Sequence, residues 1–176
     1  MSVNLRFVRV LTGIGCLAAA VSGCTSTVAG SASPATTRTT PTTPTAADVF
    51  AGLNACRVLE QLTAGQGFGP GENISRRNEC DVLKPGFGSY GLALDPVQGL
   101  IEFAATNKTV VNTTINGRNA MQANIPTGGC AIAIEVGEHA RAMVTVAMSR
   151  ISEDPQSCPS ARALAEKLEP LLPPGP

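Results

Sequence analysis

The chain has 176 residues, with as many basic as acidic side chains and a formal charge of zero. A balanced chain offers no clustered basic face for nucleic acid, so we exclude nucleic-acid binding. Aromatic residues make up 3% of the chain and tryptophan is absent, which disfavours sites that stack on sugars or bases.

The N-terminal stretch has the order of a secretory signal. Arg6 and Arg9 precede an apolar run of about a dozen residues, which is shorter than the roughly 20 that a membrane-spanning helix needs. Val21-Ser22-Gly23-Cys24 resembles a lipobox, whose cysteine receives a diacylglycerol before the signal is cleaved. We expect residues 1–23 to be removed and Cys24 to carry palmitate-type acyl chains. An uncleaved anchor and cleavage at an ordinary signal site are the alternatives.

Lipidation at Cys24 predicts attachment to the outer face of the cell membrane, which makes the membrane the first expected partner. Residues 24–47 continue from this cysteine as a segment rich in threonine, serine, proline and alanine. Such a composition has too little apolar surface to fold, so we expect a disordered tether. One domain follows over residues 48–172, with a short tail at 173–176. Without the signal, 11 basic and 13 acidic residues remain, a formal charge of −2.

Four cysteines remain once the signal is removed and Cys24 is lipidated. An even number in an exported chain predicts two disulfides. Cys56 and Cys158 fall on the core sides of two predicted helices, whereas Cys80 and Cys130 begin strands. We expect the pairs Cys56–Cys158 and Cys80–Cys130, although the other two connectivities stay open. No pair has the close spacing typical of zinc ligands, so neither a metal nor a cofactor is expected.

Three helices are predicted. The first runs from Leu53 to about Thr63, with Asn54 able to cap it. The second starts at Asp95-Pro96, a cap acceptor followed by proline. The third is capped by Ser157 and ends before Pro173-Pro174. The apolar face of the second helix is predicted to consist of Val97, Leu100, Ile101 and Ala104, and that of the third of Cys158, Ala161, Leu164, Ala165 and Leu168.

Six short stretches read as strands. Two begin at Cys80 and Tyr90, and two more flank the hairpin signal Asn116-Gly117. The last two, 130–136 and 142–148, alternate apolar and small residues about the turn Gly137-Glu138-His139, which predicts a hairpin with one buried face. The predicted class is α+β: a single domain with an antiparallel sheet of five or six strands and all three helices packed on one face.

The cysteine-containing motifs resemble those of a large actinobacterial lipoprotein family, catalogued only as a domain of unknown function. The matching residues are Asn54-Ala55-Cys56 with Val58-Leu59, Cys80-Asp81-Val82, Gly117-Arg118-Asn119-Ala120, Cys130, and Cys158 with Ala161, Leu164 and Ala165. The family's usual Asp-Pro before the first cysteine and Trp after the second are replaced here. The resemblance covers about residues 53–172. It implies an exported cell-envelope lipoprotein of high-GC Gram-positive bacteria and assigns no catalytic residue.

The sequence predicts no catalytic residues. His139 is the only histidine, and a hydrolase using it with Glu135 or Asp154 is a remote alternative, since no Gly-x-Ser-x-Gly elbow presents a serine. The neighbouring carboxylates Glu79 and Asp81 have the composition of an acid–base pair, but such pairs more often serve solubility.

Binding is therefore the predicted activity. The first hypothesis is a module that holds a small apolar or lipidic ligand between sheet and helices. The small residues that leave room for it are Ala93, Ala104, Ala120, Ala123, Ala131 and Ala133. Tight helix–sheet packing at these alanines is the alternative. The second hypothesis is an adaptor that docks another envelope protein on an exposed sheet face or edge.

Overall fold

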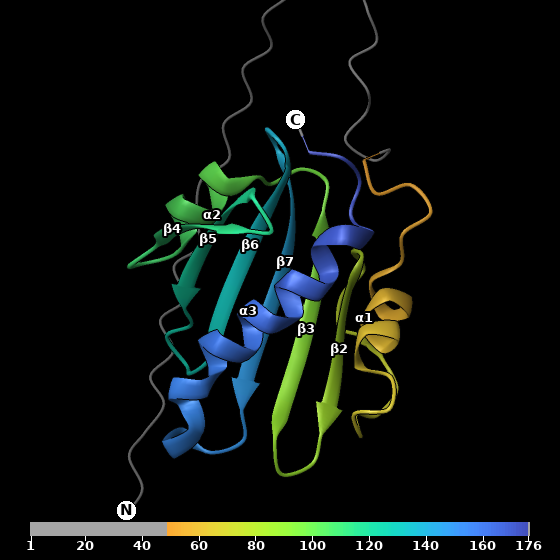
Figure 1. Ribbon diagram of the computed structural model, residues 1–176, viewed down its shortest axis with the longest axis vertical. Coiled ribbons are helices and arrows are strands. Elements are labelled where there is room, and N and C mark those ends of the chain that lie inside the picture. The colour runs from red at the N-terminus through yellow and green to blue at the C-terminus, as the bar shows by residue number, and fades with distance from the viewer. Residues whose placement is uncertain (1–48, 176) are drawn as a thin grey trace, which may run out of the picture. The chain divides into compact units, whose positions relative to one another are not determined.

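A computed structural model describes residues 49–175 (Figure 1). The predicted signal, Cys24 and the tether lie outside the described residues. The described part is α+β, as predicted, and its seven strands form one antiparallel sheet with the order β1-β2-β3-β7-β6-β5-β4. The two outermost strands of this sheet are therefore β1 and β4.

The strands correspond to the six predicted segments plus one addition. They are β1 (Glu72–Asn73), β2 (Glu79–Lys84), β3 (Gly88–Asp95), β4 (Val111–Ile115), β5 (Arg118–Asn124), β6 (Cys130–Gly137) and β7 (Ala140–Met148). The expected five or six strands thus become seven, because β1 also pairs with β2. A strand of two residues has no alternation to detect, which is why the sequence pattern misses it.

Two of the three helices begin and end close to the predicted positions. Helix α1 spans Ala55–Thr63, and its cap Asn54 accepts a hydrogen bond from the Arg57 amide at 3.0 Å. Helix α3 spans Ser157–Leu168 and buries the predicted apolar stripe, apart from the half-buried Cys158. Short 3₁₀ turns at Ile151–Gln156 and Glu169–Leu171 flank it.

The second helix differs from its prediction. Helix α2 spans Leu100–Thr106, five residues after Asp95. The Asp95 carboxylate instead accepts the Val97 amide at 3.1 Å and closes a local turn. Val97 and Ile101 are 59% and 68% exposed, whereas Phe103 is completely buried. The predicted apolar face is therefore wrong. Burial of the Phe103 side chain against the sheet sets the orientation of this seven-residue helix.

The helices pack on both faces of the sheet, which corrects the expected single-face packing. Helices α1 and α3 cover one face, where Leu59, Ile132 and Leu164 share the main core. Helix α2 lies on the other face, with its Phe103 over three alanines. Strand β6 shows the reason: its isoleucines point to the first face and its alanines to the second, and both sets are buried. Residues 130–134 of β6 are thus apolar on both faces.

Both disulfides join a helix to a strand, so the expected pairing is wrong. Cys56 of α1 pairs with Cys80 of β2, and Cys130 of β6 pairs with Cys158 of α3. Strands β2 and β6 are three positions apart in the sheet. At about 4.8 Å per step that separation is roughly 14 Å, far beyond the span of a disulfide of about 7 Å.

Candidate functional site

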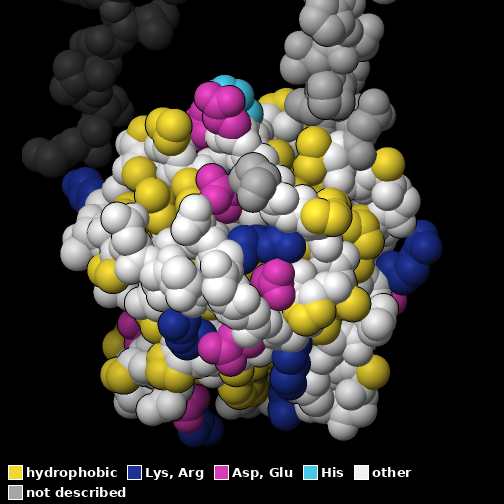
Figure 2. Space-filling model, turned by 45° about the horizontal axis from the view of Figure 1, so that its top comes forward, with side chains coloured by type: hydrophobic (Ala, Val, Ile, Leu, Met, Phe, Trp, Pro, Cys, Tyr) yellow, Lys and Arg dark blue, Asp and Glu magenta, His cyan; other side chains and the backbone are white. Residues whose placement is uncertain are grey.

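The single histidine lies on the surface beside acidic side chains, at the end of the domain that faces the viewer in Figure 2. His139 is 62% exposed, and its Nδ1 lies 3.1 Å from Glu102 Oε1. Glu135 accepts instead from Asn119, and Asp154 accepts from the Gly129 amide. The two carboxylates considered for a hydrolase therefore have other partners.

The Glu102 carboxylate has a structural role at the start of α2. It accepts the Gly99 amide at 2.7 Å, which completes a capping box, and it contacts His139 as well. Hydrogen bonds from the backbone of Glu102 and Gly99, followed by the one from His139, lower the pKa of Glu102 below its ordinary value of 4.5. This pair ties α2 to the β6–β7 turn.

The alanines proposed to leave room for a ligand are mostly filled. Ala123, Ala131 and Ala133 lie directly beneath Phe103, and Ala120 belongs to the main core. Ala104 is exposed on α2. Small residues here allow close helix–sheet packing, which was the alternative interpretation. Ala93 differs, because it lies on the part of this face that α2 does not cover.

Helix α2 contacts β5 and β6, and it leaves the same face of β2, β3 and β7 without a covering helix. Cross-strand pairing brings five side chains and a glycine to this uncovered surface, which we name the open face. Its residues are Glu79, Asp81, Gly91, Ala93, Met143 and Thr145. Glu79, Asp81, Met143 and Thr145 are half-buried, as expected of a sheet surface that solvent reaches.

Three adjoining depressions follow β2, one on the open face and two at the margins of the sheet, and together we name them the β2 groove. The first, of about 370 Å³, shares Glu79 with a second of about 150 Å³. The second shares Ile74 and Asp81 with the third, of about 690 Å³, which lies against the edge of β2. The groove therefore extends along the length of one strand.

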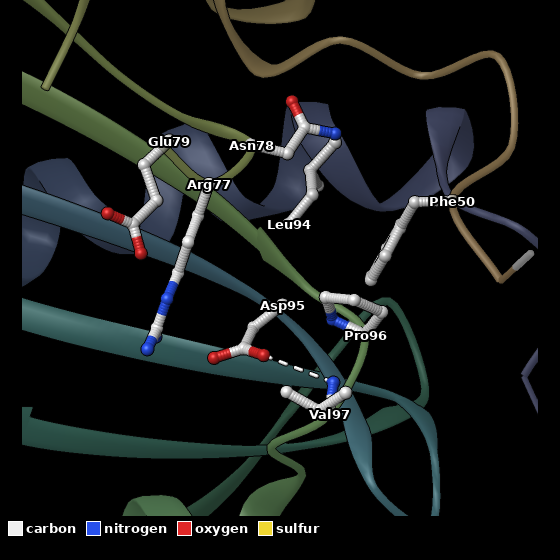
Figure 3. Close-up of a pocket in the computed structure, with 8 residues that line it drawn as sticks. All are labelled: Phe50, Arg77, Asn78, Glu79, Leu94, Asp95, Pro96 and Val97. Atoms are coloured by element: carbon white, nitrogen blue, oxygen red, sulfur yellow. Dashed lines mark hydrogen bonds between the residues drawn. The ribbon is translucent and has the colours of Figure 1, made fainter. Parts of the chain in front are cut away.

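The first depression, at the start of β2, is the most apolar and is shown in Figure 3. Strand β3 continues beyond its last pair with β2, Ala93 with Glu79, so Leu94 and Asp95 lie at an edge that β2 does not reach. Phe50 and Leu94 are buried and form its apolar base. Asp95, also buried, places a carboxylate at its wall, and the exposed Val97 completes the rim.

A buried arginine holds that wall in place. Arg141 of β7 is 6% exposed; it donates to the Gly99 carbonyl at 3.0 Å and to the Gln98 side chain at 2.9 Å. Its guanidinium carbon lies 5.5 Å from the Phe103 ring centroid, and its Nη2 lies 4.0 Å from Asp95 Oδ2. Burial lowers the pKa of Arg141, and the carboxylate of Asp95 opposes that shift. Arg141 thus joins the sheet, α2 and the segment that borders the groove.

Two carboxylates lie next to each other in the middle of the groove. Glu79 and Asp81 project from the same side of β2, since they are two residues apart. A Cβ atom at Gly91 would collide with both Asp81 Oδ1 and Thr145 Oγ1, so the absence of a side chain there lets both groups lean over β3. Burial, and secondarily the charge of Glu79, raise the pKa of Asp81 above its ordinary value of 3.8.

This raised pKa makes Asp81 a source of instability at neutral pH. Because the folded state holds the Asp81 proton more tightly than the unfolded state, the contribution of Asp81 to stability is greatest below pH 3.8 and falls as pH rises through the raised pKa. We expect Asp81→Asn to raise the melting temperature at neutral pH and to flatten this decline. Thermal melts from about pH 3 to about pH 7 measure it. Glu138→Gln is the matched control; a melting temperature lowered by Asp81→Asn would contradict the assignment.

A model of a family described as "Protein of unknown function (DUF3558)" matches residues 19–171, which is most of the chain. The chain belongs to the DUF3558 family. No curated protein and no solved structure matched this DUF3558 member.

The groove of this DUF3558 member was only partly foreseen. The sequence drew attention to Glu79 with Asp81 and, separately, to Ala93, but it did not connect them or identify Arg141. A usable signal exists: Asp95 ends an apolar strand and Arg141 stands at the start of another, and β-strand pairing sets the two opposite each other. Within residues 49–175, no helix is long and apolar enough to cross a membrane. Over the same range, no group of three or more potential ligands could hold a metal.

Proposed function

We propose that this DUF3558 member is a non-catalytic adaptor, which docks a polypeptide of another envelope protein in the β2 groove. The observation that carries the proposal is the uncovered half of the sheet, where exposed apolar side chains border a continuous groove. Ile74 and Leu83 are 58% and 62% exposed along it, and Val97 is 59% exposed at its end. Exposed apolar groups around a groove are typical of protein-binding surfaces.

We propose further that Cys24 is lipidated and that the domain is displayed on the outer face of the cell membrane. The lipobox-like stretch and the threonine-rich segment after it support this location. The family match begins at residue 19, so the stretch around Cys24 lies within the matched range. A tether of about 24 residues would let the domain reach partners away from the lipid surface.

A photo-crosslinker placed at Met143 of the full chain, in cells that naturally make it, tests the docking proposal. We expect a defined polypeptide adduct whose cross-linked residues map to the groove. Ile74→Asn is expected to abolish the adduct, since it replaces an apolar side chain of the border by a polar one without adding charge. The matched variant Val111→Asn, at a residue 55% exposed on the opposite outer strand, is expected to leave it intact. An adduct unaffected by Ile74→Asn would contradict groove docking.

A small apolar or lipidic ligand is the second candidate, because the buried base of Phe50 and Leu94 gives the first depression an apolar interior. Its 370 Å³ falls within the range of about 300–1,000 Å³ typical of ligand pockets. Native mass spectrometry of the protein from its own envelope separates the two. A reproducible small added mass, lost on denaturation, would favour this candidate over the adaptor.

A further inference from the structure

The β2 groove combines a row of carboxylates with apolar borders. Glu79 and Asp81 lie along β2, and Glu72 of β1 lies directly opposite Asp81 in the strand pairing. Like charges opposite each other across paired strands repel. Within residues 49–175 none of these three carboxylates forms an ion pair with a basic side chain. The groove thus holds three carboxylates without an ion pair, and Arg77 is the basic side chain that lines its first depression.

The surroundings of these carboxylates are suited to long basic side chains. Ile74, Ala93 and Met143 line the same depression as Glu79 and Asp81. Lysine and arginine lay their aliphatic stems on apolar surface while the charged end reaches a polar partner. Burial and the charge of Glu79 raise the pKa of Asp81, and a cation bound beside it would favour its charged form.

We propose that the β2 groove binds an extended basic segment of the partner, with lysine or arginine over Glu79 and Asp81 and an apolar side chain in the depression at Phe50. This inference rests on the proposed adaptor function and names the chemistry of the partner.

The spacing of the groove fits an extended chain. Alternate residues of an extended segment face the same way, about 6.6–6.8 Å apart, which matches the spacing of Glu79, Asp81 and Leu83 along β2. An occupant parallel or antiparallel to β2 therefore presents alternate side chains to the apolar depression, to the two carboxylates and to Leu83. A heptapeptide with apolar residues at positions 1 and 7 and basic residues at positions 3 and 5 matches this order of sites. Because the pattern is symmetric, the peptide fits in either direction.

The probe is the synthetic peptide Leu-Ser-Lys-Ser-Lys-Ser-Leu with blocked ends and a fluorophore. The control peptide carries Glu in place of both Lys. Fluorescence anisotropy with the full-length protein in detergent measures their affinities. We expect the lysine peptide to bind more tightly than the glutamate peptide, and added salt to weaken its binding, because exposed charge pairs are screened.

The decisive variant is the double substitution Glu79→Gln with Asp81→Asn, which keeps both side-chain shapes. We expect it to weaken the lysine peptide about tenfold. Glu138→Gln with Glu166→Gln removes the same charge at side chains 84% and 48% exposed, away from the groove, and is expected to change little. Equal losses in both double variants would overturn the inference, since the peptide would be responding to net charge alone.

Two further outcomes separate this inference from the adaptor proposal. If the glutamate peptide binds as well as the lysine peptide while Ile74→Asn still abolishes the cellular adduct, the adaptor stands and the basic partner is wrong. If spermine competes as effectively as the lysine peptide, a small polyamine rather than a polypeptide fits the groove, and the inference fails.

Discussion

Replacing Phe103 by alanine is expected to lower the free energy of unfolding by about 3–5 kcal/mol. Phe103 is completely buried and is the aromatic residue of α2 that covers three alanines of the sheet. The alanines cannot move to fill the space that its ring would leave. The substitution also removes the ring beneath the guanidinium of Arg141. Chemical denaturation followed by circular dichroism measures the loss.

A control on the same helix sharpens this test. Ile101 is 68% exposed, and it belongs to the apolar face that the sequence pattern predicted for this helix. Ile101→Ala is expected to change stability by no more than about 0.5 kcal/mol. If Ile101→Ala cost more than Phe103→Ala, the packing face of α2 would be the one that the sequence suggested, and the arrangement of this side of the sheet would be wrong.

Removing the disulfide between Cys130 and Cys158 is expected to cost about 2–4 kcal/mol. The bond joins the start of β6 to the start of α3 across 28 residues and restricts the unfolded chain accordingly. Cys130 is completely buried, so alanine is the better replacement, since a serine hydroxyl there would need a partner. Thermal and denaturant unfolding of Cys130→Ala with Cys158→Ala measure the cost.

The pairing itself is checked by digestion without reduction. We expect linked peptides containing Cys56 with Cys80 and Cys130 with Cys158. Removing the first pair, whose separation is 24 residues, is expected to cost a similar amount. A linked peptide containing Cys56 and Cys158 would contradict the helix-to-strand frame and restore the pairing expected from the sequence.

The stability of the domain and its proposed binding surface meet at Arg141. Its hydrogen bonds hold the segment of Gln98 and Gly99, and the same segment leads from the groove into α2. The buried Nε of Arg141 has no hydrogen-bond partner within the described residues. Most buried polar atoms have such a partner, so this one is an exception. The wall of the first depression is thus attached to the sheet through the hydrogen bonds that Arg141 donates to Gly99 and Gln98.

Local patterns in the sequence were sufficient for most of the secondary structure. Asn116-Gly117 forms the predicted hairpin turn, with φ angles of 49° and 89°. The cap at Asn54 and the apolar stripe of α3 are also confirmed. Each of these features depends on residues within a few positions of one another, which is why the sequence by itself determines them.

The arrangement of these elements was decided by the tertiary structure. Which face α2 covers, which cysteines pair and where the groove lies all depend on the strand order, which places β7 between β3 and β6. That order joins segments about 50 residues apart, such as Asp95 and Arg141, and no periodicity over a few residues encodes it. The sequence determined where the apolar residues, the helix caps and the cysteines lie. The tertiary structure decided which of them come into contact, because each strand can pair with strands far away in the sequence.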